Sequence, residues 1–269
     1  MFTLETNRAL LKLTTLVGAL LLSLGLSGCY VHSKSASTST TLVDYLSTTK
    51  DNEGFGPDKI FGIVSITADS KIYQVGSNGS LTGMFSAASD DRDFYQDSQR
   101  VLDRSIPVIV KTMARTNQYV LMPPESVLSD RVYVGVTAEE NSAFNHTNVA
   151  NGYKRISKER RMAVMAQNMG LDGVMHVNVS YGYSNEGTNI GGLVDYGKNY
   201  ATVKINVKAV DFRGNVIWKA SEASLSSRPI SAESEFGSAA DFKKLEPHLM
   251  ESLRTTLGKV MTDLESDQS

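Results

Sequence analysis

Histidine, serine and glycine are the residues of this 269-residue chain whose spacing could indicate catalysis or cofactor binding. No two histidines have the short spacing of a zinc site, and no serine lies in a Gly-x-Ser-x-Gly turn. Gly191 and Gly192 lack the preceding strand and following helix that a nucleotide-binding turn needs. The histidines are His32, His146, His176 and His248. The sequence therefore predicts no catalytic residue, no metal site and no cofactor.

The single cysteine is the most specific chemical feature of the chain. Cys29 ends the segment Leu26-Ser27-Gly28-Cys29, which closes an apolar run that begins at Leu13. This run is shorter than the roughly 20 residues that span a membrane, but its length suits the apolar core of a secretory signal. Arg8 and Lys12 precede it, as the basic part of a signal peptide does. A lone cysteine also excludes an internal disulfide and a multi-thiolate metal site.

The segment from Leu26 to Cys29 resembles the lipobox of bacterial lipoproteins, in which the cysteine thiol is acylated and the chain is cut just before it. The resemblance implies a cleaved signal peptide over residues 1–28 and a lipid anchor, such as palmitate, on Cys29. Stable attachment takes more than one acyl chain, at about 0.8 kcal/mol for each buried methylene. No aspartate follows the cysteine, so the resemblance implies the periplasmic face of the outer membrane. The alternative is an uncleaved signal anchor.

Five basic residues crowd one short stretch: Lys154, Arg155, Lys158, Arg160 and Arg161. They surround the expected start of a helix, where the helix dipole disfavours positive charge, so local helix stability does not account for them. We predict that they bind an anionic partner, such as a lipid phosphate or an acidic protein surface; the alternative is a solvated charged face. The near balance of 27 basic and 29 acidic residues argues against nucleic-acid binding.

The residues after the cysteine indicate a tether. Serine and threonine make up 10 of the 18 residues from 33 to 50. Such a segment buries too little apolar surface to fold alone, so we expect a disordered tether over residues 29–57 that holds the domain away from the membrane. The alternative is a short docked helix formed by Leu42, Val43, Tyr45 and Leu46.

One periplasmic domain is expected over residues 58–269. Its first half should contain a buried strand at Ile60–Ile66 and a helix with Leu102, Ile106, Ile109 and Met113 on one face. Pro107 is expected to kink that helix. Further strands are expected at Gln118–Met122 and Arg131–Val136, followed by a loop over residues 137–152.

The second half has the clearer pattern. A helix capped by Ser157 should end at Gly170, and alternating apolar residues then predict strands over Met175–Tyr183 and Val203–Ala209. A turn at Asp211–Asn215 leads to a third strand, and a terminal helix carries an apolar stripe. The stripe is Leu245, Leu249, Leu253, Leu257, Val260 and Leu264. The fold class is therefore α+β, with an antiparallel or mixed sheet and helices packed on one face.

Two motifs carry a resemblance: Gly170-Leu-Asp-Gly-Val174 after a helix, and Val210-Asp-Phe-Arg-Gly-Asn-Val-Ile-Trp218-Lys-Ala220. With the order of elements over residues 59–264, they resemble the periplasmic lipoprotein domains related to the curli-export lipoprotein. Similar domains occur in the outer-membrane activators of penicillin-binding proteins and at the N-terminus of the Tol-system propeller protein. The resemblance implies a non-enzymatic role in envelope assembly or regulation.

The sequence thus favours a lipid-anchored adaptor that binds another envelope protein or itself. One alternative is an oligomeric secretion channel of the curli-export type, built by membrane insertion of the Val174–Val210 hairpin, which carries several tyrosines. The other is a periplasmic domain that binds a small ligand.

Overall fold

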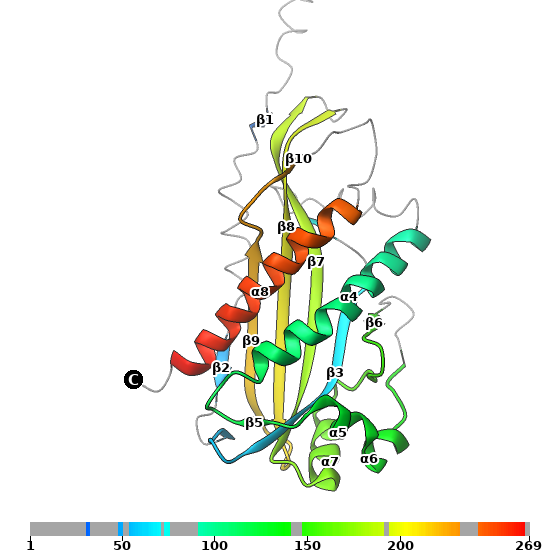
Figure 1. Ribbon diagram of the computed structural model, residues 1–269, viewed down its shortest axis with the longest axis vertical. Helices are drawn as coiled ribbons and strands as arrows, with labels where there is room; N and C mark the ends of the chain where they lie inside the picture. The colour runs from blue at the N-terminus through cyan, green and yellow to red at the C-terminus, as the bar shows by residue number, and fades with distance from the viewer. Residues whose placement is uncertain are drawn as a thin grey trace, which may run out of the picture.

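The computed structural model describes residues 31–32, 48–50, 54–70, 73–75, 91–140, 147–190, 194–231 and 242–266. Cys29, the expected signal peptide and the segment from Leu42 to Leu46 lie outside the described residues. One mixed sheet forms the centre of the fold, and two long helices lie side by side across one of its faces (Figure 1). This arrangement confirms the expected α+β class.

The sheet is organised around three successive antiparallel strands, β7, β8 and β9. Its main order is β2-β9-β8-β7-β3-β5, and β3 runs parallel to both β7 and β5. The hairpin expected over Val174–Val210 is confirmed, because β7 and β8 pair from Gly173↔Asp211 to Ile190↔Val194. Four short strands join at the sides: β1 and β4 pair with β7, β6 with β3, and β10 with β8. The strands are β1 (Val31–His32), β2 (Thr48–Lys50), β3 (Ile60–Asp69), β4 (Tyr73–Val75), β5 (Val120–Leu121), β6 (Thr147–Val149), β7 (Gly173–Ile190), β8 (Val194–Asp211), β9 (Val216–Leu225) and β10 (Ile230–Ser231).

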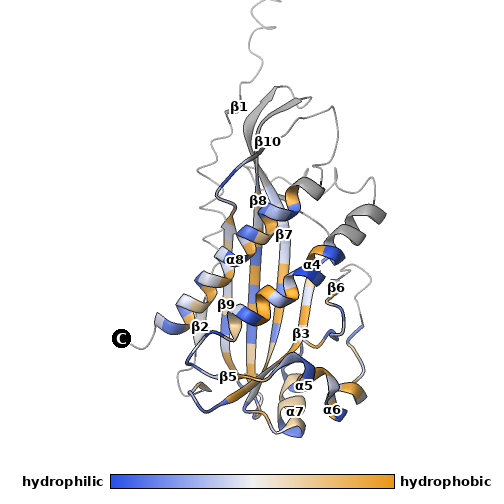
Figure 2. Ribbon diagram, viewed as in Figure 1, coloured by the Kyte–Doolittle hydropathy of each residue, from blue (hydrophilic) through white to orange (hydrophobic). Residues whose placement is uncertain are grey.

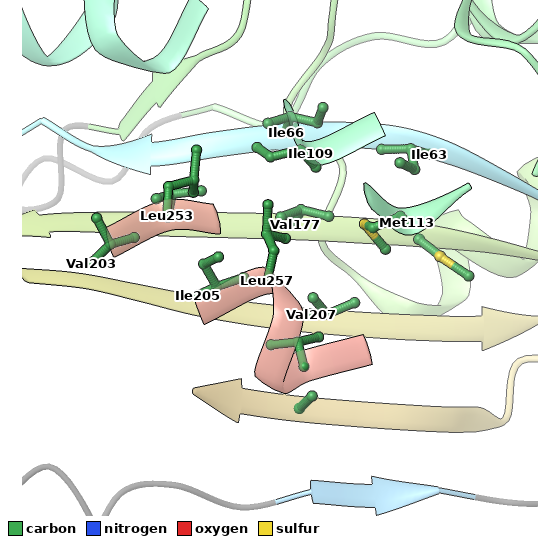
Figure 3. Packing of buried hydrophobic residues seen from close by; sticks show 14 of the residues in the cluster. Ile63, Ile66, Ile109, Met113, Val177, Val203, Ile205, Val207, Leu253 and Leu257 are labelled. Carbon is green, nitrogen blue, oxygen red and sulfur yellow. The ribbon is translucent and has the colours of Figure 1, made fainter. Parts of the chain in front are cut away.

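The larger core lies between this sheet and the helices α4 (Asp91–Met113) and α8 (Phe242–Ser266). Apolar and polar residues alternate along β7 and β8, as the colours in Figure 2 show. Successive side chains of a strand lie on opposite faces, and the apolar row packs in the larger core with the helices. Pro107 and Pro247 lie inside α4 and α8. Figure 3 shows the packing of Leu253 and Leu257 from α8, Ile109 and Met113 from α4, and Val177, Val203, Ile205 and Val207 from the sheet.

A smaller core occupies the opposite face at one end of the sheet. There α5 (Pro124–Ser129), α6 (Arg131–Gly135) and α7 (Glu159–Met169) gather, as the lower part of Figure 1 shows. Val64, Val174 and Val210 point to this side, whereas Ile63 and Met175, their chain neighbours, belong to the larger core. Among the described residues, α4 and α8 thus pack on one face of the sheet, and α5, α6 and α7 pack on one end of the other face.

The sheet and its core begin before residue 58. β2 pairs with the edge of β9, and Phe55 is buried against an aromatic cluster. The ring centroids of Phe55 and Phe61 are 5.1 Å apart, and those of Phe55 and Trp218 are 6.1 Å apart. A domain boundary at residue 58 thus leaves out residues that the structure places in the sheet and in the core.

Three local expectations were wrong. Arg131–Val136 is not a strand, because the Asp130 carboxylate accepts a hydrogen bond from the Val132 amide and starts α6. The loop expected over 137–152 contains β6, which pairs with β3. Ser157 does not cap α7: the N-cap residue is Lys158, and the Ser157 hydroxyl instead donates to Glu139.

Candidate functional site

The five basic residues predicted to bind a partner surround the start of α7, and Lys154 among them has a structural role. Its ammonium group donates to the carbonyl oxygens of Tyr133, Val134 and Val136, each at 2.7 Å. It also lies 5.3 Å from the centre of the Tyr133 ring. These carbonyls are at the C-terminal end of α6, where a cation is favourable. Lys154 therefore fixes the end of α6.

Glu139 links the same segment to α7. One of its carboxylate oxygens accepts from the amides of Ser157 and Lys158, both at 3.0 Å, and the other accepts from the Ser157 hydroxyl at 2.7 Å. Arg161 lies 3.9 Å from this carboxylate and also donates to the Thr137 carbonyl. The carboxylate thus supplies the negative charge that the N-terminus of α7 favours. Because Glu139 lies 18 residues before Ser157, the spacing of residues near α7 gave no sign of this contact.

The other three basic residues differ in their surroundings. Arg155 is partly buried and donates to the Glu140 carbonyl at 3.1 Å, whereas Lys158 and Arg160 are exposed. The structure thus brings all five predicted residues to one end of α7. It ties Lys154, Arg155 and Arg161 to the segment 133–140, and the binding of a partner by the cluster stays a prediction.

The positive surface continues from α7 onto the sheet. Lys208 of β8 donates to Glu159, in the first turn of α7, at 2.5 Å, and this hydrogen bond lowers the pKa of Glu159. Lys219 of β9 is the cross-strand partner of Lys208 and is exposed. Burial, followed by the positive charges of Lys208 and Arg155, lowers the pKa of His176 to about 4, so this imidazole is neutral at pH 7.

Sequence reasoning did not connect these lysines to the cluster. Lys204 and Lys208 occupy polar positions of the alternating pattern that predicts the strand Val203–Ala209. Alternation identifies the side of the strand but not its neighbours, and only the packing of α7 on β8 brings Lys208 to Glu159. Lys204 and Lys208 are four residues apart in one strand and therefore share a face. This spacing was a sequence signal for a basic surface on the sheet.

Two further observations on the described residues concern membrane spanning and metal binding. No helix among the described residues has the length and apolar character needed to cross a membrane. Within the same residues, no three histidine, cysteine, aspartate or glutamate side chains gather as a metal ion would require.

Comparison with known proteins gives only distant similarities. No protein-family model and no curated protein matches the chain. Among solved structures, the LpoB C-terminal domain from Salmonella enterica aligns over 70% of this chain and 93% of its own, with 13% identity and a TM-score of 0.31. The same domain from Escherichia coli aligns over 70% and 92%, with 12% identity and a TM-score of 0.29. Lipoprotein GNA1162 from Neisseria meningitidis aligns over 77% and 95%, with 15% identity and a TM-score of 0.32. Scores this low establish neither a shared fold nor a shared function.

Proposed function

We propose that the chain is an outer-membrane lipoprotein, anchored by acyl chains on Cys29, whose periplasmic domain acts as a non-enzymatic adaptor or regulatory factor for an envelope protein complex. The observation that carries this proposal is the segment Leu26-Ser27-Gly28-Cys29, which holds the only cysteine of the chain and follows a short apolar run. The chain between Cys29 and β2 then serves as the tether between the membrane and the domain, because β2 and Phe55 already belong to the sheet and the core. The domain itself contributes a surface rather than a reaction.

The basic surface around α7 supports the adaptor role. Lys158 and Arg160 are exposed at the start of α7, and Lys219 is exposed on the neighbouring sheet. Exposed positive charges on a rigid helix and strand attract and orient an acidic partner, mainly by raising the rate of association. The basic side chains that bind segment 133–140 are instead those of Lys154, Arg155 and Arg161, so removal of the exposed charges should leave the fold intact.

A crosslinking experiment in cells tests the adaptor role. Lys158→Gln with Arg160→Gln should reduce capture of envelope proteins by the full-length lipoprotein, whereas Lys111→Gln with Arg115→Gln should leave it unchanged. Lys111 and Arg115 are exposed near the end of α4, far along the chain from α7, and give the same change of charge. Equal capture by both variants would contradict the assignment of the partner surface to α7.

The secretion channel is a second candidate because of the length of the hairpin. β9 accompanies β8 only as far as Thr202↔Leu225, but β7 and β8 continue to pair up to Ile190↔Val194. Each arm therefore extends eight residues past the last β9 partner, close to the roughly 9–11 residues of a membrane-spanning strand. Light scattering of the detergent-solubilised protein separates the two: a large ring favours the channel, and a monomer or dimer favours the adaptor.

A further inference from the structure

The β7–β8 hairpin extends well beyond the body of the sheet. β9 accompanies β8 up to Thr202, which pairs with Gly182 of β7. From there the two arms continue in register to the closing pair Ile190↔Val194. Residues 182 to 190 of a strand span about 26 Å. Figure 1 shows this extension at the upper end of the molecule, whereas α5, α6 and α7 lie at the lower end.

Short strands brace the extension along both of its outer edges. β4 pairs with β7 from Gly182 to Ser184, and β1 pairs with β7 at Thr188 and Asn189. On the other arm, β10 pairs with β8 at Lys198 and Asn199. A two-stranded hairpin is only marginally stable alone, and added strands hold it by further main-chain hydrogen bonds. The extension is therefore a supported part of the sheet.

The pairing of β1 determines where the chain leads toward Cys29. β1 is antiparallel to β7, with Val31 opposite Asn189. Backward from Val31, the direction of β1 therefore points past Ile190 and away from the body of the sheet. Cys29 precedes Val31 by two residues, which is at most about 7 Å of extended chain. The acylated cysteine is thus confined to the neighbourhood of the hairpin end.

The sequence of the hairpin end suits a lipid surface. No residue from 187 to 194 is charged, and the pair that closes the ladder consists of Ile190 and Val194. Charged positions begin behind this pair, at Asp195 and at the cross-strand pair Glu186↔Lys198. An uncharged end with charged positions directly behind it fits a segment that enters a bilayer only to about 5–10 Å, the boundary between headgroups and acyl chains.

β1 also distinguishes contact with the membrane surface from passage across the membrane. Acyl chains on Cys29 would lie in the leaflet that faces the domain. A hairpin that crossed the bilayer would carry its end about 30 Å further, to the opposite surface. The pairing of Val31 with Asn189 keeps the hairpin end level with the start of the anchored chain. It therefore favours a hairpin end at the near surface.

We propose that the end of the β7–β8 hairpin lies against the phospholipid bilayer that holds the acyl chains of Cys29, so that the domain stands on this hairpin with α7 at the far end. This inference rests on the lipid anchor proposed above and deepens it, because it names the part of the domain that meets the lipid headgroups. It applies to a single copy of the chain and needs no assembly.

This orientation limits what the basic start of α7 can meet. Lys208, which binds Glu159 of α7, is the cross-strand partner of His176. Residues 176 to 190 of β7 span about 46 Å, several times the Debye length of about 8 Å. The exposed cations at the start of α7 are therefore too far from this bilayer to bind its phosphates. They face a partner deeper in the periplasm.

Fluorescence quenching in vesicles tests the proposal. Cys29 is the only cysteine, and acylation blocks its thiol, so one introduced cysteine can carry a nitrobenzoxadiazole label. The full-length lipidated protein is added to preformed vesicles of phosphatidylethanolamine and phosphatidylglycerol, with or without bromine on the upper acyl-chain carbons. Bromine should quench the label on Ile190→Cys by about half, and that on Gln167→Cys by less than about a tenth.

Gln167→Cys is the matched control, because Gln167 is exposed on α7 and its replacement leaves every basic residue in place. Equal quenching at the two positions, or no quenching at Ile190→Cys, would overturn the proposal. Dithionite, which does not cross the bilayer, should bleach both labels from outside. Protection of the label on Ile190→Cys would mean that the hairpin crosses the membrane, and this result would also overturn the proposal.

A disulfide provides an independent arm that needs no membrane. His32 and Thr188 are cross-strand partners, so the lipidated double variant His32→Cys with Thr188→Cys should form a disulfide on mild oxidation in detergent. His32→Cys with Gln167→Cys should keep both thiols free. Equal oxidation of the two double variants would contradict the pairing of β1 and overturn the proposal.

The outcomes also separate this inference from the anchor on which it depends. Palmitate on the wild type without quenching at Ile190→Cys would overturn only the contact of the hairpin end with the bilayer. Absence of palmitate from the wild type would instead overturn the anchor at Cys29 itself.

Discussion

Single residues around the start of α7 have two distinct roles. Lys154 and Arg161 bind main-chain carbonyls of the segment 133–137, whereas Lys158 and Arg160 are exposed. Glu139 offsets the positive charge by bonding two amides at the helix start. The unfavourable interaction with the helix dipole, which made the cluster conspicuous in the sequence, is thus partly relieved by a carboxylate from another segment.

Glu139→Gln should lower the free energy of unfolding by about 1–3 kcal/mol, because charge-assisted hydrogen bonds to two amides and a hydroxyl weaken together. Urea denaturation at pH 7 measures this. Glu140→Gln is the matched control, because Glu140 is the exposed neighbour and its replacement should change stability by at most about 0.5 kcal/mol. Equal effects at both positions would contradict a stabilising role of the Glu139 hydrogen bonds to Ser157 and Lys158.

The same carboxylate adds a dependence on pH. Burial alone would raise the pKa of Glu139, but hydrogen bonds from Lys158 and Ser157, with the charge of Arg161, outweigh burial and lower it. The stability from this lowered pKa is therefore present above the usual value of 4.5 and is lost as the pH falls through the folded-state value. The Gln variant should lack this component of acid destabilisation.

The lowered pKa of His176 predicts a second loss of stability on acidification, which begins at a higher pH than the loss from Glu139. Its pKa is about 4 in the fold, chiefly because of burial, against 6.5 when unfolded. Between these values the unfolded chain binds the extra proton, so acidification from pH 7 to pH 5 should cost about 2 kcal/mol. Chemical denaturation at the two pH values should show this cost in the wild type and its absence in His176→Gln. The same slope in both proteins would contradict a buried neutral imidazole.

At the scale of elements, α8 takes part in the hydrogen bonding of the sheet. The Val203 amide of β8 donates to the Ser252 hydroxyl at 3.1 Å, and that hydroxyl donates to the Ser224 carbonyl of β9 at 2.6 Å. Thr256 donates to the Val203 carbonyl at 3.2 Å. Val203 and Ser224 are cross-strand partners in β8 and β9. Hydroxyl groups of α8 therefore form hydrogen bonds with main-chain groups of both strands at this pair.

Ser252→Ala should therefore destabilise the protein by about 1–3 kcal/mol, because it leaves a buried amide and a buried carbonyl without a partner. Thermal unfolding followed by circular dichroism measures the change. Thr255→Ala on the exposed side of α8 is the control, since Thr255 bonds only within its own helix and should cost little. If the two substitutions cost the same, Ser252 does not bridge β8 and β9.

Two glycines should respond in opposite directions to alanine. A Cβ atom at Gly173 would lie 2.4 Å from the Phe61 ring and 2.8 Å from the Val210 carbonyl oxygen, whereas a Cβ atom at Gly258 in α8 meets nothing within 4 Å. Gly173→Ala should lower stability by about 1–3 kcal/mol through steric overlap. Gly258→Ala should raise it by about 0.5–1 kcal/mol, because alanine favours the helix. Denaturant midpoints of the two variants, measured side by side, check both signs.

The sequence predicted the elements whose pattern is local. Strict alternation gave β7 and β8, the Asp211–Asn215 turn gave the start of β9, and Gly170, with a φ of 68°, ends α7 as expected. Prediction failed where distant residues decide the outcome. Tyr133 is held by a hydrogen bond from its hydroxyl to the Val64 carbonyl, so α6 forms in a stretch whose β-branched residues favour a strand.

The candidate site was predictable only in part for the same reason. Charge density along the chain identified Lys154 to Arg161. The carbonyls that Lys154 binds and the Glu139 carboxylate belong to a segment that only the fold brings near. The pairing of Lys208 with Lys219 likewise depends on the register of β8 and β9, which no single segment encodes.

At the scale of the whole molecule, the proposed anchor holds a rigid domain at the membrane. The proposed anchor at Cys29 and the tether set where the domain works, and the basic start of α7 sets what it recognises. Phe55, packed on Phe61, marks where the chain enters the core. A tether fixed at this point would present the sheet to partners within reach of the membrane.

The most direct test of this account is to follow labelled palmitate in cells that express wild-type protein or Cys29→Ala, and to locate both proteins by membrane fractionation. The account predicts that the wild type carries the label in the outer-membrane fraction, and that the variant loses the label and leaves this fraction. A Cys29→Ala variant that remains in the membrane as the wild type does would contradict the lipid anchor and support an uncleaved signal anchor.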